Sequence, residues 1–190
     1  MKVGLYFGSF NPVHHGHLII ANHVVQHSEL DQVWFIVSPQ NPLKPAAGLL
    51  NEYHRLHLIR AAIDGENHLW ASDIEFKLPR PSYTIDTLTY IREKYPQHEF
   101  SIIMGSDSYQ NLRKWKNYEQ LLKTTEILIY IRAGFEEIPA YPHANIRKLE
   151  APLLQISATH IRKILKEGKS IRYLVPDIVK EEIERNHYYL

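Results

Sequence analysis

Short apolar runs alternate with segments of helical periodicity along most of the chain. Runs rich in β-branched and aromatic residues predict strands at residues 2–7, 32–37, 68–74, 100–104 and 127–131. Apolar positions three and four residues apart predict helices between them, at residues 18–27, 53–63, 85–95 and 118–123. Such alternation is typical of parallel strands joined by helical crossovers. We therefore predict an α/β fold, a doubly wound parallel sheet with helices on both faces.

The alternation ends after residue 131. A proline-containing stretch at 134–145 predicts an irregular connection, followed by a short strand at 146–149 and helices at 157–167 and 176–186. This pattern predicts a small helical appendage and not a second domain. We expect one domain over residues 1–190, with a core at 1–150 and a C-terminal helical part at 151–190. A second proline-rich loop, at 38–45, leaves the second predicted strand, where it could serve as a lid.

Composition limits the classes of partner. The 22 basic residues nearly cancel the 21 acidic ones, so no overall field attracts nucleic acid or an anionic membrane. The chain has no cysteine, which excludes a disulfide framework and thiolate chemistry. Its start lacks the features of a signal peptide, and no apolar run approaches the length of a membrane span. We therefore expect a cytoplasmic protein whose partners are small molecules.

The 12 histidines raise the question of a metal site, above all at His14, His15 and His17. An imidazole metal site needs a third ligand and a second shell nearby, whereas the other histidines fit polar helix faces and strand ends. We therefore predict no metal site made by the protein itself.

Residues 8–17, Gly-Ser-Phe-Asn-Pro-Val-His-His-Gly-His, carry the strongest chemical signal. They follow an apolar run and precede a helical segment, so they predict a tight turn between a strand and a helix. Such a turn directs backbone N–H groups and a helix N-terminus at one point, which favours phosphate binding. His14 and His17 lie three residues apart and so share one helix face. This sequence pattern matches neither the P-loop motif nor the glycine-rich turn of dinucleotide-binding proteins.

A second element that favours phosphate binding lies at residues 156–162, Ile-Ser-Ala-Thr-His-Ile-Arg. Ser157 is a good helix N-cap, and Arg162 lies one turn further on, where its guanidinium can reach an anion at the helix start. Alone, this pattern is also typical of an ordinary capped helix.

Five separated stretches together resemble the bacterial nicotinate mononucleotide adenylyltransferases, a branch of the nucleotidyltransferase superfamily. They are residues 8–17, Lys44 with Arg55, residues 82–88 (Ser-Tyr-Thr-Ile-Asp-Thr-Leu), Gly105-Ser106-Asp107 with Trp115, and residues 156–162; a trailing match covers residues 173–179. The first stretch identifies only the superfamily, and the third and fourth indicate the branch. Two positions depart from the family pattern: Leu43 stands where a histidine is common, and Lys116 follows Trp115.

The resemblance implies a Rossmann-like nucleotidyltransferase fold and adenylyl transfer from ATP to nicotinate mononucleotide, a step of NAD biosynthesis. The products are nicotinate adenine dinucleotide and pyrophosphate. Mg²⁺ is expected to arrive with ATP, held by phosphates and water. A homo-oligomer is compatible with this assignment.

The resemblance also implies roles for individual residues. His17 is assigned to the α-phosphate, His14 and Arg162 to the β- and γ-phosphates, and Lys44 to the incoming phosphate or the departing pyrophosphate. These four form the predicted catalytic set. The predicted ATP-binding residues are Gly8, Ser9, Phe10, His17, Gly105, Ser157, Thr159 and Arg162. The predicted mononucleotide-binding residues are Lys44, Tyr83, Thr84, Asp107 and Trp115, with Asp107 on ribose hydroxyls and Trp115 over the pyridine ring.

Other functions remain open at this point. Within the same enzyme class the alternatives are a pantetheine-phosphate or a nicotinamide mononucleotide adenylyltransferase. An NAD-binding oxidoreductase would share the α/β sheet, but the chain lacks the three-glycine turn and the acidic residue about twenty positions further on. A nucleotide sensor without turnover is the third class.

Overall fold

A computed structural model of the chain describes residues 1–42, 47–152 and 155–190. Its strands are β1 (Lys2–Gly8), β2 (Gln32–Val37), β3 (Leu69–Ser72), β4 (Glu99–Gly105), β5 (Ile127–Tyr130) and β6 (Ile146–Leu149). They form one 6-stranded sheet in the order β3-β2-β1-β4-β5-β6, and every neighbouring pair is parallel. The predicted doubly wound parallel sheet is therefore confirmed.

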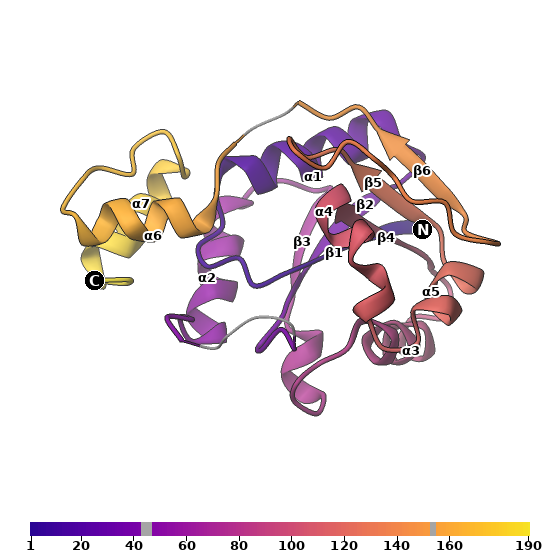
Figure 1. The fold of residues 1–190 in the computed structure, drawn as a ribbon. Helices are drawn as coiled ribbons and strands as arrows, with labels where there is room; N and C mark the ends of the chain where they lie inside the picture. The colour runs from indigo at the N-terminus through magenta and orange to yellow at the C-terminus, as the bar shows by residue number, and fades with distance from the viewer. Residues whose placement is uncertain (43–46, 153–154) are drawn as a thin grey trace.

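Helices cover both faces of the sheet (Figure 1). The helices are α1 (His15–His27), α2 (Glu52–Ala62), α3 (Thr84–Lys94), α4 (Ser106–Gln110), α5 (Tyr118–Thr124), α6 (Ala158–Lys166) and α7 (Asp177–Arg185), with 3₁₀ turns η1 (Ile74–Lys77) and η2 (Leu112–Lys114). One hydrophobic cluster joins the sheet to α1, α2, α6 and α7, and a second joins the other face to α3, α4 and α5. The α6–α7 pair forms the predicted appendage, beside α2 in Figure 1.

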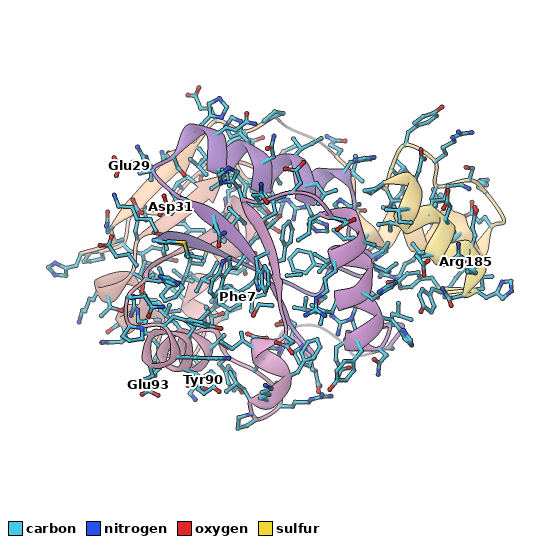
Figure 2. The ribbon with its side chains drawn as sticks, turned by 180° about the vertical axis from the view of Figure 1, so that it is seen from behind. Phe7, Glu29, Asp31, Tyr90, Glu93 and Arg185 are labelled. Atoms are coloured by element: carbon cyan, nitrogen blue, oxygen red, sulfur yellow. The ribbon has the colours of Figure 1, made fainter. Side chains whose placement is uncertain are left out.

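Burial on both faces explains why the strands appear in the sequence as continuous apolar runs. In β2, Val33 and Phe35 belong to the first hydrophobic cluster, whereas Trp34 and Ile36 belong to the second. Both sets must be apolar because each faces a layer of helices. Figure 2 shows the same arrangement from behind, with Phe7 of β1 near the middle of the molecule and Glu93 of α3 at its edge.

Two predicted boundaries differ by two or three residues, and two short segments were not predicted. The third strand ends at Ser72, because the chain turns there and the Ser72 hydroxyl accepts a hydrogen bond from the Ile74 N–H (3.3 Å). Helix α1 begins at His15, three residues before the predicted start, with His14 as its N-cap. The segments α4 and η2 were not predicted, since five and three residues are too few to show a period.

The winding of the sheet reverses between β1 and β4. Strands β2 and β3 continue outward from one side of β1, whereas β4, β5 and β6 continue outward from the other. Loops at the carboxyl ends of the two central strands diverge at such a point and leave a crevice for ligands. The turn after Gly8 and the segment after Gly105 border this crevice, as the sequence predicted.

A buried arginine ties the loops of this edge together. Arg55 of α2 is fully buried, and its guanidinium donates to the carbonyl oxygens of Ser9 (2.5 Å), Ser38 (2.8 Å), Pro39 (3.2 Å) and Leu50 (2.7 Å). These carbonyls belong to the segments that follow β1 and β2 and to the segment before α2. Arg55 therefore fixes the backbone that borders the crevice.

Among the described residues, no helix has both the length and the apolar character needed to cross a bilayer.

Replacing Arg55 by lysine should destabilise the protein by about 3 kcal/mol. A lysine ammonium can reach only part of the set of carbonyls, and each buried carbonyl left without a donor costs about 1–3 kcal/mol. Urea unfolding would measure the change, with Arg60→Lys, at an exposed position of the same helix, as the matched control. Equal midpoints for the two variants would contradict the assigned role.

Candidate functional site

Three adjoining cavities open at the switch point of the sheet. We call them the large cavity (≈ 450 Å³), the central cavity (≈ 250 Å³) and the outer cavity (≈ 270 Å³). Tyr6 and Tyr130 line all three, so the cavities form one continuous site with the central cavity adjoining each of the others. Their hydroxyl groups lie 3.2 Å apart, and burial raises the pKa of both phenols, which keeps them protonated.

The predicted site residues that the structure describes all line these cavities. The large cavity is lined by Gly8, Ser9, Tyr83, Thr84, Gly105, Asp107 and Trp115. The central cavity is lined by Gly8, Ser9, Phe10, His17, Asp107, Thr159 and Arg162, and the outer cavity by His14, His17 and Ser157. Lys44 lies outside the described residues, so its role stays a prediction. The structure thus brings elements 150 residues apart in the sequence into one site, while the role of each side chain stays a prediction.

The two histidines at the start of α1 form a stacked pair. Their ring centroids are 3.6 Å apart at an interplanar angle of 23°, and the His14 N–H donates to Nδ1 of His17 (3.3 Å). An accepting Nδ1 carries no hydrogen, so the ring hydrogen of His17 is on Nε2, which makes Nε2 a donor. The Phe10 ring packs edge-on against His17 at 5.0 Å between centroids. Contacts within the protein therefore hold His17 in one orientation.

Gly16 makes room for the His14 ring. A Cβ at position 16 would lie 3.0 Å from His14 Nδ1 and 3.1 Å from its Cε1, closer than ordinary contact. Any larger residue would push the His14 ring away from its stacking partner. This close approach gives a physical reason for the glycine in the His-x-Gly-His element.

His14 is buried and uncharged at neutral pH. Only 4% of the residue is exposed, and its Nδ1 has no hydrogen-bond partner. Burial, with a smaller contribution from the positive charge of Arg132, lowers the His14 pKa to about 4. At neutral pH this ring can therefore offer a hydrogen bond but not a full charge.

The phosphate-directed turn and the C-terminal helical part contact each other directly. Arg162 Nη1 donates to the carbonyl oxygen of Asn11 (2.7 Å), which brings α6 against the turn after β1. Ser157 caps α6 as predicted, since its hydroxyl accepts from the His160 N–H (3.2 Å). The turn itself has Phe10 in the left-handed region, with φ of 45°, and its ring buried. The two elements that the sequence analysis paired are therefore neighbours in space.

An ion pair not expected from the sequence borders the central cavity. Arg132 Nη1 donates to Asp107 Oδ2 (2.9 Å), and Arg132 lines both the central and the outer cavity. The other oxygen, Asp107 Oδ1, is buried and unpartnered. Gly105 provides its space, because a Cβ there would lie within contact distance of both Asp107 Oδ1 and the Arg132 side chain.

The Ser-Tyr-Thr element divides into two roles. Tyr83 and Thr84 line the large cavity at the N-terminus of α3. Ser82 and Thr87 instead donate hydrogen bonds to the buried carboxylate of Glu75. Ser82, Tyr83 and Thr84 therefore line the large cavity, but the Ser82 hydroxyl is already bonded to Glu75, and Thr87 does not line the cavity.

Lys116, which departs from the family pattern, is paired. Its ammonium bonds Asp86 of α3 at 2.8 and 3.0 Å and lies 5.0 Å from the centroid of the Tyr83 ring. It therefore links the Trp115 side of the large cavity to the Tyr83 side.

Sequence reasoning missed Arg132, Glu75 and the Tyr6–Tyr130 pair. Arg132 had a signal, because it is a cation two residues past a strand that ends at the ligand edge. No sequence signal pointed to Glu75, since its partners come from other segments of the chain. The tyrosines lay inside runs that appeared to be plain strands, which hid the polar atom at the end of each side chain.

Chemically, the site offers neutral and cationic donors around the central cavity. His17, Arg132 and Arg162 line that cavity, and Arg132 is compensated by Asp107. Within the described residues no three histidine, cysteine or acidic side chains gather where they could ligate a metal ion. The arrangement suits a polyphosphate held between two larger organic groups.

Comparison with known proteins gives the same picture. The cytidylyltransferase-like family profile matches residues 5–164. A protein of Cytophaga hutchinsonii named "Probable nicotinate-nucleotide adenylyltransferase" is 51% identical over 189 residues, covering 100% of this chain and 98% of the relative. A protein of Flavobacterium johnsoniae with the same name is 48% identical over 191 residues, covering 100% and 99%.

Solved structures share the fold at low sequence identity. A Plasmodium falciparum nicotinic acid mononucleotide adenylyltransferase complexed with NaAD has a TM-score of 0.83 at 20% identity, covering 99% of this chain and 97% of that one. A putative nicotinate-nucleotide adenylyltransferase of Vibrio parahaemolyticus has a TM-score of 0.73 at 22% identity, covering 99% and 94%. Together with the family match and the close relatives, the architecture shows that the chain belongs to the cytidylyltransferase-like family, among the nicotinate-nucleotide adenylyltransferases, which are nucleotidyltransferase enzymes.

Proposed function

We propose that the protein transfers the adenylyl group of ATP to nicotinate mononucleotide, giving nicotinate adenine dinucleotide and pyrophosphate for NAD biosynthesis. The observation that carries the proposal is the row of adjoining cavities, in which the histidine- and arginine-lined central cavity lies between two larger spaces. A dinucleotide has the same layout, two nucleosides joined through phosphates. The names of the close relatives support the same reaction.

The chemistry requires positioning and charge stabilisation more than proton transfer. The 5′-phosphate of the mononucleotide, whose second pKa is near 6, is already mostly dianionic at pH 7 and needs no general base. Its oxygen attacks the α-phosphorus of ATP in line, forming one P–O bond while the bond to the bridging oxygen of the β-phosphate breaks and pyrophosphate leaves with that electron pair. The enzyme must align two polyanions and stabilise the charge that shifts to the leaving oxygens.

The central and outer cavities provide the groups for that task. We assign Nε2–H of His17 to the α-phosphate, and His14 and Arg162 to the β- and γ-phosphates. The Ser9 and Phe10 backbone, with Ser157 and Thr159, would cradle the triphosphate. Arg132 would add a cation near the outer cavity, where we place the adenosine.

The large cavity suits the mononucleotide. The first N–H groups of a helix have no partner within the helix, and those at Tyr83 and Thr84 begin α3 at the cavity wall. We assign them to the pyridine carboxylate, with Trp115 over the ring. Asp107 would accept from ribose hydroxyls, since each carboxylate oxygen can accept more than one hydrogen bond. Lys44 keeps its predicted role at the phosphates.

The donor set argues that Mg²⁺ would arrive with its nucleotide. The described residues include no group of three or more metal-binding side chains, and the Asp107 carboxylate is paired with Arg132. Phosphate oxygens and water would hold the ion, which supplies charge neutralisation of the triphosphate. A single domain and a cytoplasmic location remain part of this proposal, and a homo-oligomer is compatible with it.

His17→Ala should lower turnover by roughly a hundredfold to a thousandfold, as expected for loss of one donor to charge that develops in the transition state. Mononucleotide binding should change much less. Steady-state release of pyrophosphate would measure both, with His27→Ala at the exposed end of the same helix as control. Normal kcat with only a raised KM would exclude the assigned role.

The His14 ring should titrate with a pKa of about 4 in the free protein and higher when an unreactive ATP analogue is bound. A neighbouring polyanion favours the charged imidazolium, so nucleotide binding should take up a proton at mildly acidic pH. In the protein alone, the pKa of His14 is lower in the folded state than in the unfolded chain. Between about pH 6.5 and pH 4 the unfolded chain therefore binds more protons, so the free energy of unfolding should fall as the pH drops through this range.

NMR of the histidine ring with and without the analogue checks the two pKa values, and His14→Gln should flatten the acid part of the stability curve. The exposed His143→Asn serves as the control for that curve. A free-protein pKa near 6.5 would contradict the buried environment.

The enzyme should prefer nicotinate to nicotinamide mononucleotide by at least about tenfold. N–H groups that bond a carboxylate would face the NH₂ of the amide donor to donor, and a charge-assisted hydrogen bond contributes about 1.5–3 kcal/mol. The measurement is kcat/KM for each mononucleotide at fixed ATP. Equal values would overturn the substrate while leaving adenylyl transfer intact, whereas no pyrophosphate with either would overturn the reaction.

A further inference from the structure

The floor of the large cavity contains a buried carboxylate that the proposed chemistry does not use. Glu75 lies in η1, just after β3, and is 1% exposed. Its Oε2 accepts from the hydroxyls of Ser38 (2.6 Å) and Ser82 (2.6 Å), and its Oε1 accepts from the hydroxyl of Thr87 (2.8 Å). Burial raises the Glu75 pKa and these three donors oppose that rise, so the hydroxyls supply part of the solvation that the carboxylate has lost.

The three hydroxyls come from two segments that border the large cavity, the one after β2 and the one around the start of α3. Ser38 follows β2, Ser82 precedes α3, and Thr87 lies in the first turn of α3. Tyr83 and Thr84 stand between the latter two, so the carboxylate holds the chain on both sides of the N–H groups that begin α3. The position of those groups therefore depends on Glu75.

The same network continues to the phosphate-directed turn. The Ser38 N–H donates to the carbonyl of Gly8 (2.9 Å), and the Ser38 carbonyl accepts from Arg55, which also donates to the carbonyl of Ser9. A chain of hydrogen bonds thus runs from the turn after β1 through Ser38 and Glu75 to the start of α3. It spans the distance between the two ends of the mononucleotide as we have placed it.

A carboxylate suits this position better than a neutral side chain. Each hydroxyl has one hydrogen, and all three lie within hydrogen-bond distance of an anion that has only acceptors. The Thr87 hydroxyl has a second, longer contact to the Tyr83 carbonyl oxygen (3.2 Å), against 2.8 Å to Glu75. Glutamine would replace one oxygen by an NH₂ group, which faces hydroxyls that already donate, so at least one of them must rotate away. Charge-assisted bonds are also stronger and shorter, which fixes the geometry more tightly.

We propose that Glu75 is a positioning residue for the mononucleotide, setting the distance between the N-terminus of α3 and the phosphate turn. The inference rests on the proposed function, since it concerns the substrate of that same site. A ligand held at its pyridine end and at its phosphate loses alignment when one anchor moves, and about 1 Å of misplacement can cost about a hundredfold in rate. ATP, which we place in the central and outer cavities, does not touch the α3 anchor.

The test measures KM for each substrate and the preference between the two mononucleotides. Glu75→Gln should raise KM for nicotinate mononucleotide by roughly tenfold, which is the effect of weakening about one charge-assisted hydrogen bond, and leave KM for ATP within about twofold. The preference for nicotinate over nicotinamide mononucleotide should shrink, because the amide never gains the α3 contact. A role confined to stability would not alter this ratio.

Thr87 offers a milder variant with matched controls. Thr87→Val removes one donor at nearly constant volume and should move KM and preference in the same direction by a smaller factor, whereas Thr87→Ser should restore both. Thr89→Val removes an exposed hydroxyl of the same helix, bonded only to its own helix backbone, and should change neither. If the Glu75→Gln variant does not fold, the Thr87→Val variant provides the test on its own.

The possible outcomes separate the two proposals. Wild-type enzyme without mononucleotide-dependent pyrophosphate release would overturn the proposed function itself. Active wild type with unchanged KM and preference in Glu75→Gln and Thr87→Val would overturn only the positioning role. Equal rises of KM for ATP and mononucleotide would also overturn it, since they would indicate a general loosening of the site.

Discussion

The buried guanidinium of Arg55 is the constraint on which the ligand edge depends. Loops at the carboxyl ends of parallel strands have carbonyls that no neighbouring strand satisfies, and burying them without donors is costly. The planar guanidinium has several N–H donors, and these bond the buried carbonyls of both segments, the one after β1 and the one after β2. Because Ser38 is held by Arg55 on one side and by Glu75 on the other, the rigidity of the edge extends to α3.

Around this frame the polar groups of the site are held by contacts within the protein itself. His14 is stacked, desolvated and uncharged, and His17 is held between the His14 and Phe10 rings. Arg132 is compensated by Asp107, so the crevice is not an unbalanced cationic surface. Oriented dipoles that need no rearrangement stabilise developing charge more effectively than mobile groups, which is consistent with a reaction that depends on positioning.

Much of this could be predicted from the sequence because the relevant signals are local. Strands buried on both faces appear in the sequence as apolar runs, and the turn between a strand and a helix appears as the pattern of residues 8–17. What could not be predicted depends on contacts between distant segments. Arg132 reaches Asp107 only because β5 lies next to β4, and Glu75 meets Ser38 only through the pairing of β2 with β3. Ser82 and Thr87 belong to the stretch that carries the family resemblance, but nothing in the sequence indicates that their hydroxyls bond Glu75.

The shared wall formed by Tyr6 and Tyr130 makes the three cavities thermodynamically one system. Both phenols stay protonated and bond to each other, and each borders every cavity. A ligand that shifts either ring in one cavity alters the shape of the other two. Binding linkage is reciprocal, so whatever factor ATP imposes on mononucleotide affinity through this wall, the mononucleotide must impose on ATP.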